Sequence, residues 1–119
     1  MALPSASLFG KPEQPGWLDP TELAPLLDAP GPPLVVDVRS PAEYDGPLGH
    51  IESATNIPLD EFAARVAEIT DTGRPVILVC HTDRRSSAAC QHLRSLGVTE
   101  AGVLRGGMVA WTQAGLPTA

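Results

Sequence analysis

The chain has 119 residues, of which 43% are hydrophobic and 18% charged, with a formal net charge of −6. This length fits one domain with its own core, so disulfide or metal cross-links are not required. The acidic balance argues against nucleic acid or an anionic membrane as a partner, because both select basic surfaces. No stretch approaches the roughly 18 apolar residues of a membrane span, and the N-terminus lacks signal-peptide features, so a cytoplasmic location is expected.

Residues 1–16 carry three prolines and two glycines without apolar periodicity, which predicts an extended N-terminal arm ahead of a folded domain at 17–119. The arm is either disordered or anchored on the domain through Leu8, Phe9 and Trp17. A helix should follow, because Asp19 and Glu22 have the spacing of a capping box. Its apolar stripe contains Leu23, Leu26 and Leu27, and Pro25 predicts that it is short or bent.

Strands and helices then alternate along the chain. The apolar runs 34–38 and 76–79 predict buried strands, and 101–104 predicts a short one. Helices are expected after a second cap signature at Ser40-Pro-Ala-Glu43 and at 60–69, 86–96 and 108–114. The predicted inward residues are Phe62, Val66 and Ile69 in the second of these helices, and Ala89, Cys90, Leu93 and Leu96 in the third.

This alternation predicts an α/β fold with a central, mostly parallel sheet and helices on both faces. In such sheets ligands bind at the carboxyl ends of the strands. Cys80 ends the strand 76–79 and therefore lies at that edge. The sequence thus places a potentially reactive thiol where a ligand is expected.

The segment after Cys80 is wholly polar, and packing alone does not require this. A strand–loop–helix joint brings backbone N–H groups and a helix N-terminus next to the cysteine sulfur, and both favour the nucleophilic thiolate. Arginines in the loop add positive charge, so the stretch predicts a cysteine nucleophile in an anion cradle. Its candidate members are His81, Thr82, Asp83, Arg84, Arg85 and Ser86. Cys90, by contrast, has the position of a buried core residue, and a resolving thiol is the less favoured interpretation.

Five segments, in order and at family spacing, resemble a single-domain rhodanese, a thiosulfate sulfurtransferase. They are Leu34-Val-Val-Asp-Val-Arg-Ser-Pro-Ala-Glu-Tyr44, Gly49-His-Ile-Glu-Ser-Ala-Thr-Asn-Ile-Pro58, residues 76–86 around the cysteine, Leu93-Arg-Ser-Leu-Gly97, and Leu104-Arg-Gly-Gly-Met-Val-Ala-Trp-Thr-Gln-Ala-Gly-Leu-Pro117. The resemblance covers residues from about 17 to the end. It implies a rhodanese-like three-layer fold around a five-stranded sheet.

The resemblance also implies an activity. Cys80 accepts a sulfane sulfur from a small anionic donor such as thiosulfate, becomes a persulfide, and passes the sulfur to cyanide, a dithiol or a protein thiol. No cofactor and no metal are expected. One alternative is a persulfide carrier or redox-sensing module that exchanges sulfur with a cysteine desulfurase or a sulfur-acceptor protein.

A further alternative is a phosphatase or arsenate reductase of the same fold. Relatives of that kind have a loop one residue longer, with arginine six positions after the cysteine, because phosphate and arsenate are larger than a sulfur atom. Here Arg85 is the fifth residue after Cys80 and Ser86 the sixth, which favours sulfur.

Two positions depart from the family pattern. Asp83 stands where glycine is common, which suggests a left-handed loop residue whose carboxylate points away from the thiolate or pairs with Arg84 or Arg85. Glu43 stands where larger members carry a substrate-binding arginine, and it is expected to cap a helix.

The remaining candidates have supporting roles. A structural network is expected to contain Asp37, Arg39, Glu43 and His50. Candidates for the mouth of the site are Arg105, Gly106 and Met108, although Met108 and Trp111 also have the spacing of core positions.

Overall fold

The computed structural model describes residues 16–119, so the predicted arm, including Leu8 and Phe9, lies outside it except for Gly16. Gly16 is the first residue of a sheet strand. The sheet contains five strands in the order β1-β5-β4-β2-β3, and every pairing is parallel. Their bounds are β1 Gly16–Leu18, β2 Leu34–Asp37, β3 Thr55–Asn56, β4 Val76–Val79 and β5 Ala101–Leu104. The predicted α/β architecture is confirmed.

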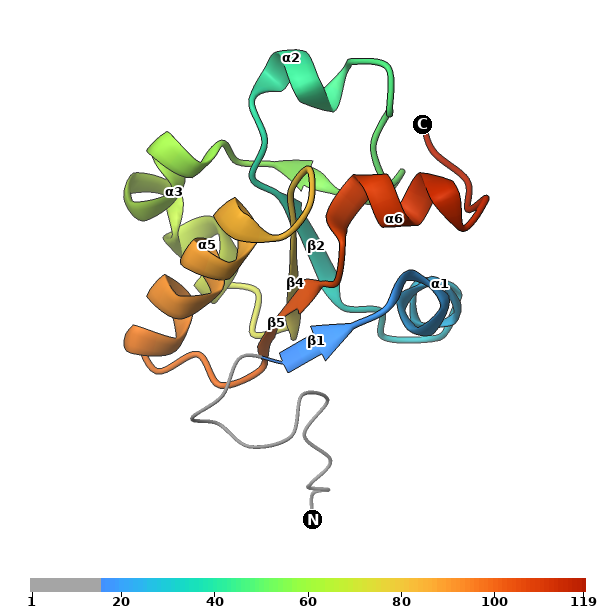
Figure 1. Ribbon diagram of the computed structural model, residues 1–119. Coiled ribbons are helices and arrows are strands. Elements are labelled where there is room, and N and C mark those ends of the chain that lie inside the picture. The colour runs from blue at the N-terminus through green and yellow to red at the C-terminus, as the bar shows by residue number, and fades with distance from the viewer. Residues whose placement is uncertain (1–15) are drawn as a thin grey trace.

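Helices cover both faces of this sheet, which gives three layers (Figure 1). One face carries α1 (Pro20–Asp28) and α6 (Gly107–Gln113). The other carries α3 (Leu59–Arg65), α4 (Ala67–Thr70) and α5 (Arg84–Ser95), whereas the short α2 (Pro41–Tyr44) lies beyond the carboxyl end of β2. Within residues 16–119, no helix combines the length and hydropathy needed to cross a bilayer.

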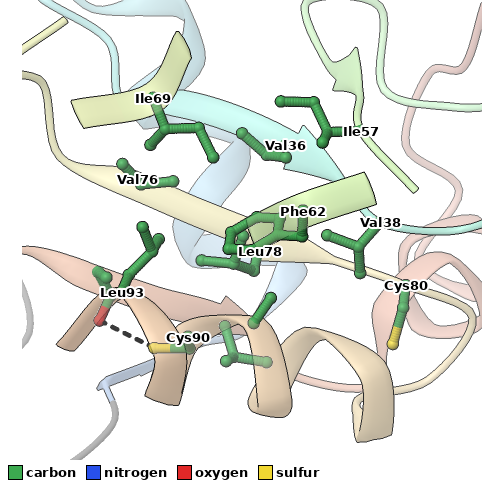
Figure 2. Packing of buried hydrophobic residues seen from close by; sticks show 13 residues of the cluster. Val36, Val38, Ile57, Phe62, Ile69, Val76, Leu78, Cys80, Cys90 and Leu93 are labelled. Carbon is green, nitrogen blue, oxygen red and sulfur yellow. Dashed lines mark hydrogen bonds between the residues drawn. The ribbon is translucent and has the colours of Figure 1, made fainter. Parts of the chain in front are cut away.

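The central strand β4 is buried on both sides, as its continuous apolar run predicts. Val76, Leu78 and Cys80 belong to the core cluster on the α5 side of the sheet, whereas Ile77 and Val79 belong to the cluster on the α1 and α6 side. Figure 2 shows the first cluster, with Cys80 at its end beside the first turn of α5. The period of two along β4 therefore fixes the face on which the Cys80 side chain lies.

Both predicted capping signatures begin helices. The Glu22 carboxylate accepts the backbone N–H of Asp19 at 2.8 Å ahead of α1, which is nine residues long and contains Pro25. At α2, the Ser40 hydroxyl accepts the Glu43 N–H at 3.2 Å, and Glu43 Oε1 accepts the Ser40 N–H at 3.1 Å. Such reciprocal bonds satisfy amides that a helix start otherwise leaves unpaired.

The predicted helix at 60–69 is interrupted. Phe62 and Ile69 are buried as expected, but the chain forms two helices that meet at Val66. Val66 keeps helical angles (φ −60°, ψ −26°), while its carbonyl accepts the N–H of Ile69 at 2.9 Å, three residues on. The same carbonyl also accepts the N–H of Thr70 at 3.0 Å, and the segment divides there without a proline or glycine.

Other boundaries also differ from the predictions. α5 begins at Arg84, two residues before the predicted start at Ser86, because the backbone carbonyl of Asp83 accepts the N–H of Ser87 at 2.9 Å. Leu96 was predicted to be buried but is 53% exposed, because it follows the last helical residue. The strands β1 and β3 were not predicted individually, since three and two residues are too few to show a period.

Candidate active site

Cys80 lies at the carboxyl end of β4 with only 1% of its surface exposed. Its Sγ accepts the backbone N–H of Ser86 at 3.3 Å and lies 3.2 Å from the Ser86 hydroxyl oxygen. Ser86 is fully buried in the first turn of α5. The Cys80 sulfur therefore has two potential hydrogen-bond donors on the side of α5, the N–H and the hydroxyl of Ser86.

The loop after Cys80 has its carbonyl groups on the side of α6. The Cys80 carbonyl accepts the N–H of Met108 at 2.9 Å, and the His81 carbonyl accepts the N–H of Val109 at 3.1 Å. A trans peptide points its N–H opposite to its C=O, so the amides that follow these carbonyls point away from α6. Among the described residues, no backbone carbonyl accepts an N–H from residues 81–85. The backbone therefore leaves these amides without an acceptor, and their use as an anion cradle stays a prediction.

This contact with α6 depends on Gly107. Its φ is +57°, and a Cβ added there would overlap the carbonyl oxygens of Cys80, His81 and Thr82. Only glycine therefore permits the N-terminus of α6 to approach the loop so closely. No sequence signal assigned Gly107 to the cysteine loop.

The two loop arginines have different surroundings. Arg85 donates to both carboxylate oxygens of Glu43, at 2.7 and 2.9 Å. The hydrogen bond from Arg85 is the main reason that the pKa of Glu43 falls to about 2, and Glu43 in turn raises the pKa of Arg85. Arg84 is exposed, and no ion pair links it to another residue in the described range 16–119. The charge of Arg85 is thus offset by Glu43, whereas the charge of Arg84 is not offset by an ion pair in the described range.

The exposed residues His81 and Thr82 precede Asp83, which is the N-cap position of α5. Its φ of −150° is negative, so the residue is not left-handed and glycine is not required there. Within the described range, no ion pair joins Asp83 to either arginine. The expectation of a left-handed residue at this position is wrong.

A buried ion pair supports the neighbouring strand end. Arg39 and Asp37 are each about 1% exposed at the side chain and approach to 2.7 Å. Arg39 also donates to the carbonyls of Glu43 and Gly49, at 3.2 and 2.8 Å, which ties the α2 region to the sheet. The Asn56 side-chain amide donates to the carbonyls of Asp37 and Arg39 at 2.9 Å each. The sequence had not singled out Asn56.

His50 lies in the same region, with a part-buried side chain. Its ring stacks on Tyr44 with 3.7 Å between ring centroids, and its Nδ1 lies 2.9 Å from the Tyr44 carbonyl. The Tyr44 hydroxyl donates to the Ala54 carbonyl at 2.7 Å. These contacts give His50 a structural role in holding the segment after α2.

The candidates at the mouth of the site diverge. Arg105 forms an ion pair with Asp19 at 3.0 Å, and its guanidinium carbon lies 5.3 Å from the centre of the Trp17 ring. The Arg105 charge is thus paired with Asp19, the residue that follows β1. Met108 is buried in the α6-side core, and Gly106 has a φ of +76° at the helix start.

Cys90 is a buried core residue, as expected. Its thiol donates to the Ala101 carbonyl at 3.3 Å, drawn as a dashed line in Figure 2. Burial raises its pKa, which suppresses the thiolate form. This environment makes Cys90 a poor nucleophile compared with a cysteine in an anion cradle.

A groove of about 310 Å³ borders the cysteine loop, and its lining includes Arg85, Ser40, Asp60 and Glu61. A larger cavity of about 360 Å³ lies on the opposite side of the sheet, between α1 and α6, with Trp111 in its wall. Of the predicted site residues, Arg85 lines the groove beside the loop, and none lines the second cavity.

A parallel sheet with a cysteine-headed, amide-lined loop at its carboxyl edge defines a class of α/β proteins that bind small anions beside a thiol. Comparison with known proteins gives the family. The profile of the Rhodanese-like domain matches residues 19–114, and the chain belongs to this family.

Among its relatives, the uncharacterized protein YqhL of Bacillus subtilis is 46% identical over 77 residues, which cover 65% of this chain and 59% of YqhL. A sulfurtransferase of Allochromatium vinosum is 38% identical over 71% of this chain and 76% of its own. The crystal structure of thiosulfate sulfurtransferase from Pseudomonas aeruginosa superposes with a TM-score of 0.74 at 31% identity, covering 88% of this chain and 20% of that one. The chain thus spans little more than half the length of YqhL.

Proposed function

We propose that this protein is a sulfurtransferase that carries a sulfane sulfur on Cys80 as a persulfide. The observation that supports this most directly is the geometry around the Cys80 sulfur. Ser86 presents its N–H and its hydroxyl to Sγ, and the loop amides lack backbone acceptors among the described residues. Such donors stabilise a thiolate and then the anionic terminal sulfur of a persulfide.

The reaction has two displacements. The Cys80 thiolate attacks the outer sulfur of thiosulfate, a new S–S bond forms, and the donor S–S bond breaks so that sulfite leaves with the electron pair. An acceptor thiolate or cyanide then attacks the terminal sulfur and frees the Cys80 thiolate. The product with cyanide is thiocyanate.

A persulfide carrier that works between proteins is the second candidate. The ion pair between Arg85 and Glu43 favours it, because Glu43 offsets the charge of a loop cation that would otherwise attract dianionic thiosulfate. Comparison of thiosulfate turnover with sulfur transfer from a persulfidated cysteine desulfurase separates the two. Slow thiosulfate turnover with fast transfer from the desulfurase identifies the carrier.

Mass spectrometry of the protein after thiosulfate treatment tests the proposal. The expected result is the mass of one added sulfur atom on the peptide that contains Cys80, together with thiocyanate formation from cyanide. Cys80→Ser should lose both signals, and Cys90→Ser is the matched control that keeps them. No adduct and no thiocyanate would refute a thiosulfate sulfurtransferase, and phosphate ester hydrolysis without an adduct would identify the phosphatase alternative.

A further inference from the structure

The two arginines of the cysteine loop are adjacent in sequence but electrostatically different. Glu43 holds Arg85 through two hydrogen bonds of 2.7 and 2.9 Å, whereas Arg84 is exposed and has no ion pair within the described range. A guanidinium paired this closely with a carboxylate has almost no net charge at a distance. For a ligand at Cys80, the Glu43 carboxylate therefore offsets much of the charge that Arg85 would otherwise supply.

Glu43 is fixed in this position by its own helix. Its Oε1 also accepts the N–H of Ser40 at 3.1 Å, and its backbone N–H bonds to the Ser40 hydroxyl at 3.2 Å. The carboxylate is therefore held by the capping box of α2 on one side and by Arg85 on the other. With its pKa near 2 it stays charged at any working pH, so the pair is a constant feature of the site.

Apart from Arg85, no cationic residue among those described lines the groove beside it. The groove beside it includes the carboxylates of Asp60 and Glu61, and Glu61 is paired with Arg65 at 2.9 Å. A ligand entering from this side meets the Arg85–Glu43 ion pair and the Asp60 carboxylate, while the charge of Glu61 is offset by Arg65. Such a field penalises a dianion more than a monoanion, because the interaction energy scales with ligand charge.

We propose that Glu43 is a specificity-determining residue: by neutralising Arg85, it selects monoanionic sulfane-sulfur donors, the persulfides, over dianionic thiosulfate. The inference rests on the proposed function, since it concerns the donor that loads Cys80. With a persulfide R–S–S⁻, the Cys80 thiolate attacks the terminal sulfur, the donor S–S bond breaks, and the thiolate R–S⁻ leaves. One anion enters and one leaves, so charge and electrons balance without a further reactant.

Two donors that differ by one charge provide the test. Thiosulfate carries two negative charges and methanethiosulfonate one, and both give up an outer sulfur bonded to an oxidised sulfur. The measured quantity is the ratio of kcat/KM for thiosulfate to kcat/KM for methanethiosulfonate. This ratio is independent of the fraction of active protein, so incomplete folding of a variant does not change it.

Glu43→Gln keeps the size of the side chain and removes its charge, which leaves Arg85 unpaired. We expect the ratio to rise on the order of fivefold, as one unscreened positive charge near the loop favours the dianion. Arg85→Gln should lower the ratio, because Glu43 is then the unpaired charge. The double variant E43Q/R85Q lacks both charges and should return close to the native ratio.

Glu61→Gln is the matched control: it removes a carboxylate from the same groove, but Arg65 keeps its ion pair with Glu68, so no cation is left unpaired. Its ratio should stay near the native value. An unchanged ratio in E43Q, or an equal rise in E61Q, would overturn the assignment of Glu43. A double variant whose ratio stays as high as that of E43Q would also overturn it. If both donors load sulfur onto Cys80 but E43Q does not change the ratio, only this inference is rejected. Loading by neither donor rejects the proposed function as well.

Discussion

Ser86 approaches the Cys80 sulfur twice, with its backbone N–H at 3.3 Å and its hydroxyl oxygen at 3.2 Å. The side chain is fully buried, so its hydroxyl has no water to bond and needs a partner within the protein. The loop between the two residues is short enough for the first turn of α5 to meet the sulfur. The same contact satisfies a buried polar group and stabilises an anionic sulfur.

Ser86→Ala should slow the reaction of Cys80 without unfolding the protein. It removes the hydroxyl donor and retains the backbone N–H, so the loss corresponds to one hydrogen bond to a charged group, about 1.5–3 kcal/mol at most. We expect a roughly tenfold lower rate of sulfur loading or of iodoacetamide alkylation at neutral pH. Ser87→Ala, one residue further along α5, should react at the native rate. Equal rates for all three proteins would show that the hydroxyl does not act on the sulfur.

Gly107→Ala should displace the cysteine loop. The new Cβ overlaps the carbonyls that meet the N-terminus of α6, and φ is +57°, so we expect a loss of at least about 2 kcal/mol in unfolding free energy. Gly115→Ala is the matched control, because Gly115 also has a positive φ (+75°) but open space around it. In that control, urea denaturation should show a loss of unfolding free energy of only about 1–2 kcal/mol, which comes from backbone strain. A similar loss in the two variants would contradict the close-approach explanation.

Asp37→Ala should be strongly destabilising. It leaves the Arg39 guanidinium buried without its carboxylate, and removal of one partner of a buried pair typically costs about 3–5 kcal/mol. Glu61→Ala breaks an exposed ion pair with Arg65, for which a loss below about 1 kcal/mol is expected. Chemical denaturation of the two variants beside the native protein provides the comparison. Equal, small losses would mean that Arg39 reaches water when its partner is absent.

The ion pair of Glu43 with Arg85 predicts a specific acid sensitivity. The pKa of Glu43 in the folded protein is about 2, below its ordinary value of 4.5, mainly because of the hydrogen bond from Arg85. Its stabilising contribution is therefore complete above about pH 4.5 and is lost as the pH falls toward 2. Both side chains are about a third exposed, so the contribution is at most about 1 kcal/mol.

The stability difference between the native protein and Glu43→Gln measures this contribution. The difference should be largest near neutral pH and should vanish near pH 2. Glu52→Gln removes an exposed carboxylate outside the ion pairs of the described range, and its difference from the native protein serves as the reference. A Glu43→Gln difference that is constant across this range would mean that the pair does not stabilise the fold.

Much of the fold follows from local pattern. The continuous apolar run of β4 and the nearly continuous run of β2 are typical of buried strands, and the two capping boxes indicate where α1 and α2 begin. Cys80 and the helix after it follow from the same pattern, as does the burial of Cys90. These features depend on residues close together in the chain, so periodicity and capping chemistry are sufficient.

The tertiary structure determines which charges of the cysteine loop are paired and how the loop is held in place. Arg85 meets Glu43 from 42 residues away, and the carbonyls that follow Cys80 are held by α6, which packs there only because position 107 is glycine. The short strands β1 and β3 likewise form because longer neighbours supply their hydrogen bonds. The sequence by itself determined which cysteine sits at the end of a buried strand. Only the packing of distant segments determined which of the two loop arginines pairs with a carboxylate, because charge pairing depends on distance in space and not on order along the chain.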